Sequence, residues 1–245
     1  GDRVMGGAKT GAMADFAVVP AGALRPIPDS LDYERAAALG AAYTTAYTAL
    51  VELGDLRAGQ WMLVNGASGG VSLAAIDLAR HFGAKIIAAT GSPEKMDRIA
   101  RLYEPDAVIE AKGRFREQVT KITDGALCNL VCDPVGGDVF EESTRCVAFG
   151  GKLLVVGFAG GRIAQIATNI PLIKGFSIVG VRAGEYARRF PERGQRIANA
   201  VSELASNGSI NPAIDRVLPL SQWRNGFSAM ANRELVGKLI LKPGA

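Results

Sequence analysis

The sequence predicts an α/β fold built on a doubly wound parallel sheet. Residues 61–64 and 85–90 are apolar almost throughout, and such runs alternate with segments of helical period. This is the pattern of strands that are buried on both faces and joined by helical crossovers. The 30 glycines fit an architecture rich in turns. Right-handed crossovers place ligands at the carboxyl ends of the strands, so we expect a binding site along that edge.

The composition limits the class of protein. With 245 residues, 48% hydrophobic and 21% charged, the chain has room for one large or two small globular domains with a sizeable core. The net charge of +4 comes without a block of lysine and arginine, so it does not indicate a nucleic-acid partner. No apolar run approaches the ~20 residues that cross a bilayer, so no membrane partner is expected.

The cysteines and the single histidine limit the metal and thiol chemistry. Cys128, Cys132 and Cys146 lie within predicted strands or helices, and their spacing fits neither a disulfide framework nor a zinc site. We therefore expect reduced core thiols in a cytoplasmic protein. His81 is the one histidine, which nearly excludes His-based triads and multi-His metal sites, and a place at a helix C-terminus accounts for it.

The chain opens with a short segment that we expect to be β-rich. Residues 11–20 have strand character, and residues 26–29 (PIPD) form a linker with a restricted backbone. An alanine-rich helix is expected from residue 32 to residue 54. We assign residues 1–33 to a first domain and residues 34–182 to the domain that contains the sheet.

The stretch from Trp61 to Arg80 organises the chain. A buried strand at 61–64 leads into a glycine-rich turn and then into an apolar stripe of helical period. This order lays a dinucleotide pyrophosphate on a helix N-terminus, where unpaired amides and the helix dipole face the negative charge. Read as GxGxxG the motif is imperfect, with Ala67, Gly69 and Ser72 at its three positions, so a turn without a ligand is the alternative. The residues predicted to hold the cofactor here are Ser68, Gly69, Gly70 and Val71.

Strands and helices continue to alternate beyond this stretch. Ser92, Pro93 and Glu94 form a typical helix start, with Ser92 as the N-cap. Further strands are expected at residues 85–90, 107–109, 129–132, 151–158 and 176–181, and helices from Pro93, over 114–123 and from the 133–137 loop to Val147. The loops that follow the strands begin at Gly66, Gly91, Pro134 and Ala159. They all fall at the carboxyl edge of the sheet, which indicates a Rossmann domain.

The last part of the sequence does not extend this repeat. A helix is expected over residues 193–207, and a second helix over 222–231 is flanked by strands at 213–220 and 237–242. We assign residues 183–245 to a hinge helix and a return to the domain that opens the chain.

Eight motifs, in this order and spacing, together point to a known family. They are GDRV, GAMADF, IPD, YTTAY, LVNGASGGV, DPVGGDVF, GKLLVVGFAGG and GKLIL. With them the chain resembles the medium-chain dehydrogenase/reductase superfamily, closest to its zinc-free NADPH:quinone oxidoreductase (zeta-crystallin-like) branch. The resemblance implies a Rossmann domain plus a partial GroES-like β-rich domain. Members usually carry a longer N-terminal part of the GroES-like domain, so we expect a fragment or a chain truncated at the front.

The same resemblance implies that no zinc is bound. Zinc-dependent members carry a cysteine-rich lobe after the GDRV segment, whereas residues 5–14 contain no cysteine. The absence of catalytic zinc ligands is implied by the branch of the family.

The end of the second expected strand of the sheet favours NADPH over NADH. An NAD-binding Rossmann fold places an acidic residue on the ribose 2′-hydroxyl about 20 residues after the glycine turn. Here that place holds Thr90-Gly91-Ser92, and Lys95 follows one helical turn later, where it can pair with a 2′-phosphate. The alternative is that Ser92 is only a cap and Lys95 a solvated surface lysine. Glu94 argues against NADPH, although the helix dipole explains an acid in a first turn.

The resemblance adds the residues that would surround the cofactor. It implies 2′-phosphate contacts from Gly91, Ser92, Lys95 and Arg233; the family's tyrosine is matched only near Ala111, where Arg114 could substitute. The nicotinamide and pyrophosphate would be lined by Thr45, Gly69, Gly70 and Val71, and the nicotinamide ribose and carboxamide by Val135, Gly136, Phe158 and Ala159. Ordinary packing is the alternative role for Phe158, and also for Tyr43 and Tyr47 as polar groups near the nicotinamide.

These expectations lead to a function. We expect NADPH-dependent reduction of a quinone or an α,β-unsaturated carbonyl by hydride transfer without zinc, in which the cofactor carries the chemistry. We name no catalytic residue, because the resemblance places most of the substrate pocket in the N-terminal part. For the same reason we expect this chain to bind NADPH but to turn over poorly. The alternatives are a trans-2-enoyl-thioester (acyl-CoA or acyl-carrier-protein) reductase and a non-catalytic NADPH-binding protein.

The last expected strand of the sheet, Phe176 to Val181, predicts a homodimer. It is short and apolar, and it would leave an exposed edge that the same strand of a second subunit can cover. Family members often pair in this way. Cover by a loop or by the C-terminal helix is the alternative.

Overall fold

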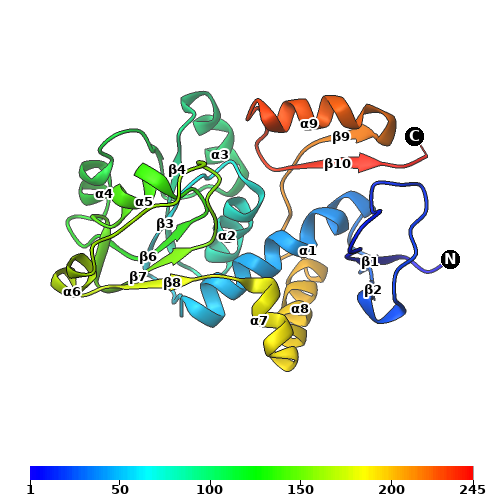
Figure 1. The fold of residues 1–245 in the computed structure, drawn as a ribbon, viewed down its shortest axis with the longest axis horizontal. Coiled ribbons are helices and arrows are strands. Elements are labelled where there is room, and N and C mark those ends of the chain that lie inside the picture. Colours follow the sequence, from blue (N-terminus) through cyan, green and yellow to red (C-terminus); the bar gives the residue numbers. More distant parts are fainter. Residues whose placement is uncertain (245) are drawn as a thin grey trace.

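A six-stranded parallel sheet forms the centre of the molecule (Figure 1). The computed structural model describes residues 1–244. The sheet order is β5-β4-β3-β6-β7-β8. The first strand of this sheet, β3, therefore lies in its middle; β4 and β5 extend it to one edge, and β6, β7 and β8 extend it to the other. The predicted α/β doubly wound fold is therefore confirmed. The strands are β3 (Trp61–Val64), β4 (Lys85–Thr90), β5 (Ala107–Glu110), β6 (Cys128–Asp133), β7 (Val147–Val155) and β8 (Ser177–Gly180).

Alternate residues of each strand face opposite layers of helices. In β3, Met62 and Val64 pack into one cluster with α1 and α2, whereas Leu63 packs into the other with α4 and α5. Both faces of the sheet are thereby buried, which is why its strands are apolar throughout. The layers contain α1 (Tyr33–Tyr47), continued by a π-helical segment at Thr48–Leu53, α2 (Gly70–His81), α3 (Met96–Tyr103), α4 (Arg116–Ile122), α5 (Gly137–Ser143) and α6 (Asn169–Lys174).

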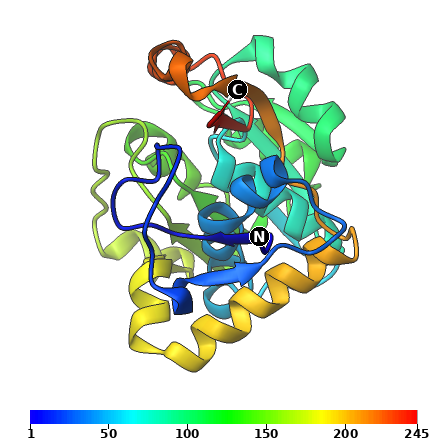
Figure 2. The same cartoon turned by 90° about the vertical axis from the view of Figure 1, so that its right-hand side faces the viewer.

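The two ends of the chain form two small sheets on the same side of the large sheet (Figures 1 and 2). β1 (Val4–Gly6) and β2 (Leu24–Pro26) pair antiparallel. β9 (Ile214–Pro219) and β10 (Lys238–Lys242) are parallel neighbours, connected through α9 (Trp223–Ala231). The connection from the large sheet runs through α7 (Ala183–Arg189) and α8 (Pro191–Ser206). The domain boundaries at residues 33 and 182 stay a prediction.

None of the helices within residues 1–244 combines the length and the apolar character needed to cross a membrane.

Residues 11–20, expected to form a strand, have no regular secondary structure. Phe16 and Val18 are almost completely exposed, at 93% and 103%. A strand needs a neighbour that satisfies its backbone groups, and none of the strands within residues 1–244 pairs with this segment. The apolar spacing that suggested a strand was therefore not sufficient to form one.

The helix expected to reach Val147 was also too long. α5 ends at Ser143, whose carbonyl accepts from the Cys146 N–H at 2.9 Å in a turn. Val147 instead opens β7, where it pairs with Cys128. β7 ends at Val155, so the loop that carries Phe158 starts earlier than expected.

Cys128, Cys132 and Cys146 are free and buried, as predicted. Burial raises the pKa of the Cys132 thiol to about 12. It likewise raises the pKa of the Cys146 thiol to about 12. All three thiols are therefore protonated core groups at neutral pH.

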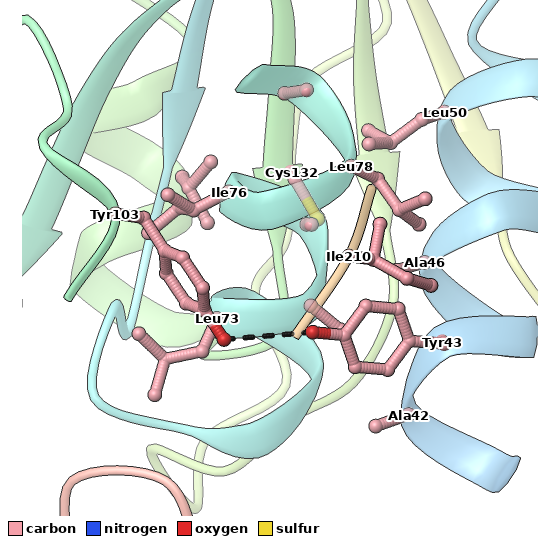
Figure 3. Packing of buried hydrophobic residues seen from close by; sticks show 14 of the residues in the cluster. Ala42, Tyr43, Ala46, Leu50, Leu73, Ile76, Leu78, Tyr103, Cys132 and Ile210 are labelled. Atoms are coloured by element: carbon pink, nitrogen blue, oxygen red, sulfur yellow. Dashed lines mark hydrogen bonds between the residues drawn. The ribbon is translucent and has the colours of Figure 1, made fainter. Parts of the chain in front are cut away.

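A buried polar network joins three helices to the segment before β9, and Figure 3 shows the contact between its two tyrosines, Tyr43 and Tyr103. The Tyr43 hydroxyl on α1 donates to Asp77 Oδ2 on α2 at 2.5 Å and lies 3.5 Å from the Tyr103 hydroxyl on α3. The Asn211 N–H donates to the same Asp77 oxygen at 2.7 Å, and the Tyr103 hydroxyl donates to the Asn211 carbonyl at 2.6 Å. Burial raises the pKa of Asp77 against the opposing effect of these hydrogen bonds. Tyr43 is 2% exposed, so it belongs to the core.

The raised pKa of Asp77 predicts a pH-dependent stability. A carboxyl group with a higher pKa in the folded chain favours the folded state below its ordinary pKa, and this contribution is lost as the pH rises through the folded-state value. Asp77→Asn keeps an oxygen that accepts from Tyr43 but does not titrate. We expect the free energy of unfolding of the variant, relative to wild type, to rise as the pH is raised above about 4, the ordinary pKa of an aspartate. Urea unfolding measures it, with the exposed Asp124→Asn as the control for loss of one charge. A difference that falls with pH contradicts the raised pKa.

Candidate functional site

The turn between β3 and α2 leaves a helix N-terminus without a cap. Gly69 is the N-cap residue; no side chain hydrogen bonds there, and the first turn contains no acidic residue. The Leu73 N–H donates to the Gly69 carbonyl at 2.9 Å, so the amides before Leu73 have no partner within the helix. Gly66 has φ +58°, and a Cβ on it would lie 2.9 Å from Val135 Cγ2, so a glycine is required there. An uncapped helix start above a tight glycine turn is suited to bind an anion.

Two further loops pack beside this turn at the carboxyl edge of the sheet. A Cβ on Gly136 would lie 3.0 Å from Phe158 Cδ1, so the loops after β6 and β7 touch. The Ala159 N–H donates to the Pro134 carbonyl at 2.9 Å and thereby ties the two loops together. Val135 packs against the glycine turn of the first loop. The structure thus brings Val135, Gly136, Phe158 and Ala159 together; their contact with a cofactor stays a prediction.

Asp133, which the sequence analysis did not single out, fixes the loop after β6. It is fully buried and accepts from the Val135 N–H at 3.1 Å, the Gly136 N–H at 3.0 Å and Asn65 Nδ2 at 3.1 Å. Burial raises its pKa, although these donors act in the opposite direction. Asn65 directly follows the neighbouring strand β3, so the hydrogen bond between Asn65 and Asp133 connects two loops of the candidate site. The sequence did contain a signal for this pair, because a polar residue directly follows each of the two expected apolar strands, at 61–64 and 129–132.

Lys238 at the start of β10 was also missed. A Cβ on Gly70 would lie 2.6 Å from Lys238 Cε and 3.2 Å from Lys238 Nζ, so this ammonium group lies beside the first turn of α2. The Gly237 N–H donates to the Ser68 carbonyl at 3.0 Å and thereby holds the start of β10 against the glycine turn. A cation is unfavourable at the positive end of a helix dipole unless an anion binds between them. The sequence analysis placed Lys238 only within a strand, because its contact is with the turn before α2, far earlier in the chain.

The end of β4 and the start of α3 form the second part of the site. Ser92 is the N-cap residue of the 3-10 turn at Pro93–Lys95, but its hydroxyl donates to the Glu94 carboxylate instead of capping the helix, which corrects the expected cap. The Ser92 hydroxyl is the main reason that the pKa of Glu94 is lowered. Lys95 is not a solvated lysine: it is 8% exposed and donates to the carbonyls of Arg233 and, at 3.1 Å, Leu235. Two predicted phosphate contacts, Lys95 and Arg233, are thus neighbours in space.

Thr45 is the predicted residue with the weakest structural support. It lies half-buried on α1, which packs against α2. Its hydroxyl makes no hydrogen bond to the site loops within residues 1–244. Its assignment to the nicotinamide stays a prediction.

Comparison with known proteins establishes the family. Residues 70–199 match the model of the zinc-binding dehydrogenase family. The chain belongs to this family. Its predicted membership of the quinone oxidoreductase-like branch of the medium-chain dehydrogenases/reductases is confirmed. The protein is an oxidoreductase that binds a nicotinamide cofactor.

Relatives and solved structures agree with this placement. The chain is 35% identical over 244 residues to a quinone oxidoreductase-like protein 2 homolog of Nematostella vectensis, covering 98% of this chain and 67% of that protein. It is 32% identical to a quinone oxidoreductase of Pseudomonas aeruginosa, covering 99% and 75%. The quinone oxidoreductase from Thermus thermophilus, whose structure was solved also as a complex with NADPH, superposes with a TM-score of 0.86 at 27% identity, covering 99% and 77%.

The name of the matched family refers to zinc. Residues 1–244 contain no group of three or more His, Cys, Asp or Glu side chains that could hold a metal ion. Zinc independence of the reaction stays a prediction.

Gly136 offers a test of the loop geometry. It has φ +75°, and a Cβ would lie 2.9 Å from the Arg162 carbonyl oxygen, so Gly136→Ala combines backbone strain with a contact to backbone. We expect a loss of about 1–3 kcal/mol in unfolding free energy and weaker binding of nicotinamide cofactors. Gly113→Ala is the matched control, because Gly113 also has a positive φ, +61°, but open space around its Cβ position. Equal cofactor affinity in the two variants would show that this loop does not contact the cofactor.

Proposed function

We propose that the protein reduces a quinone or an α,β-unsaturated carbonyl with NADPH, by hydride transfer and without zinc. The observation that carries the proposal is the convergence of three loops and Lys238 on the uncapped N-terminus of α2. This arrangement lies at the point where the strand order reverses, which is where open α/β sheets bind their ligands.

In this proposal the protein binds and orients, and the cofactor supplies the hydride when bound. The Gly69 N–H already donates to the Gly66 carbonyl at 2.9 Å, so the amides of Gly70 and Val71 and the Lys238 ammonium would bind the pyrophosphate. The loops that carry Gly136 and Phe158 frame the nicotinamide. An electron-poor acceptor takes a hydride without a metal to polarise it, and the resulting oxyanion takes a proton from water, so positioning is the main requirement. No catalytic residue is assigned.

The choice of NADPH rests on the end of β4. No carboxylate is fixed on the strand end at Thr90 and Gly91, and the exposed Arg233 lies at the turn bound by Lys95. Glu94 lies in the turn that follows, and its hydrogen bond with Ser92 holds it within that turn. We assign Ser92, Lys95 and Arg233 to the 2′-phosphate end of the site.

A fluorescence titration tests the cofactor and separates binding from turnover. We expect NADPH to bind at least about tenfold more tightly than NADH, a difference of about 1.4 kcal/mol. Turnover of a panel of quinones and enones is then measured with the same sample. Equal affinities for the two cofactors would contradict the 2′-phosphate site, and binding without turnover of any acceptor would favour a non-catalytic NADPH-binding protein.

A second candidate function is trans-2-enoyl-thioester reduction. The chain is 30% identical to a stretch of a highly-reducing polyketide synthase of Aureobasidium melanogenum, covering 95% of this chain and 11% of that protein. The same acceptor panel distinguishes the two functions, because an enoyl thioester that is reduced faster than any quinone favours the second.

We also propose an isologous homodimer through β8. This strand pairs only with β7 within residues 1–244, so its other edge is unpaired, and its residues are half-buried or exposed. Sedimentation equilibrium is expected to give about twice the chain mass of 25.7 kDa, the symmetric dimer being the commonest oligomer. A monomer at all concentrations would favour cover of this edge by another segment.

The buried free thiols support a cytoplasmic location.

A further inference from the structure

The helical hairpin formed by α7 and α8 carries most of the net charge of the protein. Residues 182–196 contain five arginines and two glutamates, a net charge of +3, whereas the whole chain has a net charge of +4. The exposed arginines of this hairpin are Arg182, Arg188, Arg189, Arg193 and Arg196. They form no continuous run in the sequence, but α7 and α8 pack against each other and place them on one hairpin, which projects below α1 in Figure 1. Such a surface raises the local concentration of anions.

Neighbouring carboxylates neutralise only part of this charge. Arg188 and Arg189 share one partner, Glu185, at 2.5 and 2.8 Å. Arg182 and Arg196 form no ion pair within residues 1–244. The hairpin therefore keeps an excess of guanidinium groups, the side chains that bind phosphate through paired hydrogen bonds.

An exposed aromatic ring lies among these guanidinium groups. Phe190 joins the two helices and is 48% exposed. The centroid of its ring lies 5.1 Å from the centroid of the Tyr186 ring and 5.4 Å from the guanidinium carbon of Arg193. The Arg193 guanidinium group donates to the Tyr186 hydroxyl at 2.7 Å, which holds the three side chains together. An aromatic ring beside several cations is suited to stack a nucleobase while the cations bind its phosphates.

The hairpin starts at the same edge of the sheet as the candidate cofactor site, but beyond the nicotinamide end. Arg182 directly follows Val181, whose N–H donates to the Val155 carbonyl at the end of β7 at 2.8 Å. Along the strand order, the proposed 2′-phosphate contacts lie at β4, the pyrophosphate contacts at β3, and the loops that frame the nicotinamide at β6 and β7. β8 and the hairpin come next. An anion bound there is separated from the cofactor's own phosphates by the nicotinamide, so it belongs on the substrate side.

We propose that the α7–α8 hairpin binds the nucleotide end of a coenzyme A thioester. The adenine stacks on Phe190, the phosphates pair with the arginines, and the flexible pantetheine arm connects this surface to the carboxyl edge of the sheet. A quinone carries no phosphate and would leave the surface without a ligand. The inference rests on the second candidate function, trans-2-enoyl-thioester reduction, and names coenzyme A as the carrier of the enoyl group.

Calorimetric titration of the full chain with coenzyme A tests the proposal without turnover. NADPH is present at saturation, so that the candidate cofactor site is filled, and dephospho-coenzyme A, which lacks the 3′-phosphate, is the matched ligand. We expect coenzyme A to bind about three- to fivefold more tightly than dephospho-coenzyme A, the effect of one exposed charged contact. Arg188→Gln combined with Arg189→Gln is expected to weaken coenzyme A about tenfold, because two such contacts are lost. Equal affinities for the two ligands would overturn the proposal.

Two further variants keep the binding test interpretable. Arg57→Gln combined with Arg80→Gln removes two exposed, ion-paired arginines elsewhere on the surface, and we expect it to change the affinity by less than about twofold. Equal losses in the two double variants would show a general effect of charge and overturn the proposal. Phe190→Leu keeps an apolar side chain but removes the ring, so it is expected to weaken coenzyme A and dephospho-coenzyme A alike, by about fivefold or more. It tests the site independently if thermal unfolding shows that the arginine variant does not fold.

Steady-state kinetics separate this site from the reaction itself. The same trans-2-enoyl group is offered on coenzyme A and on N-acetylcysteamine, which keeps the thioester but lacks the nucleotide. We expect the double substitution of Arg188 and Arg189 to raise the KM for the coenzyme A thioester about tenfold and to leave the KM for the truncated thioester and both kcat values unchanged.

The outcomes distinguish this proposal from those on which it depends. Equal KM values of wild type for the two thioesters would overturn the coenzyme A site and leave thioester reduction intact, whereas reduction of quinones alone would overturn both. A preference for an acyl-carrier-protein thioester would overturn the proposal by assigning the arginines to a protein partner. Coenzyme A binding is also measured without NADPH, so a failure of the NADPH assignment is seen separately in the fluorescence titration.

Discussion

The tight turn between β3 and α2 is the constraint on which the rest of the site depends. It turns a buried central strand directly into a helix, and a glycine is required at Gly66, because φ is +58° and Val135 lies where a Cβ would be. Each neighbouring segment is placed against this turn. The Ala67 N–H donates to the Ala89 carbonyl of β4 at 2.9 Å, and the Gly237 N–H donates to the Ser68 carbonyl at 3.0 Å. A side chain in the turn would therefore displace several parts of the chain together.

The electrostatics of the turn favour the proposed binding of an anion there. The start of α2 has no capping side chain and no acid in its first turn, and Lys238 lies beside it. Without a ligand, two sources of positive potential face each other. A protein selected only for stability would place an aspartate or a serine there. The arrangement becomes favourable when a diphosphate lies between the helix and the ammonium group.

The sequence predicted the sheet well because both of its faces are buried. β4 occupies residues 85–90 as expected, and β3 and β5 begin where expected, since an apolar run bounded by turns has one clear interpretation in a parallel sheet. The strand predicted at residues 11–20 does not form, because the spacing of apolar residues carries no information about a partner strand. Lys238 and Asp133 were missed because their roles depend on contacts across the fold. For Lys95 the sequence analysis offered a phosphate contact or a solvated surface position. Neither alternative included its burial against a distant turn, which only the tertiary structure reveals.

The segment from Arg233 to Lys238 connects the two ends of the candidate site. Lys95 binds its first part, Asp215 binds Val236, and Lys238 reaches the glycine turn. Burial opposes the ionisation of Asp215, but the Val236 N–H and the guanidinium groups of Arg216 and Arg98 hold its pKa below the ordinary range. Asp215 is therefore charged at neutral pH and strengthens its hold on the segment. One short stretch of backbone is thus fixed at both ends of the candidate site. The proposed contacts with the 2′-phosphate and with the pyrophosphate therefore depend on the same structural element.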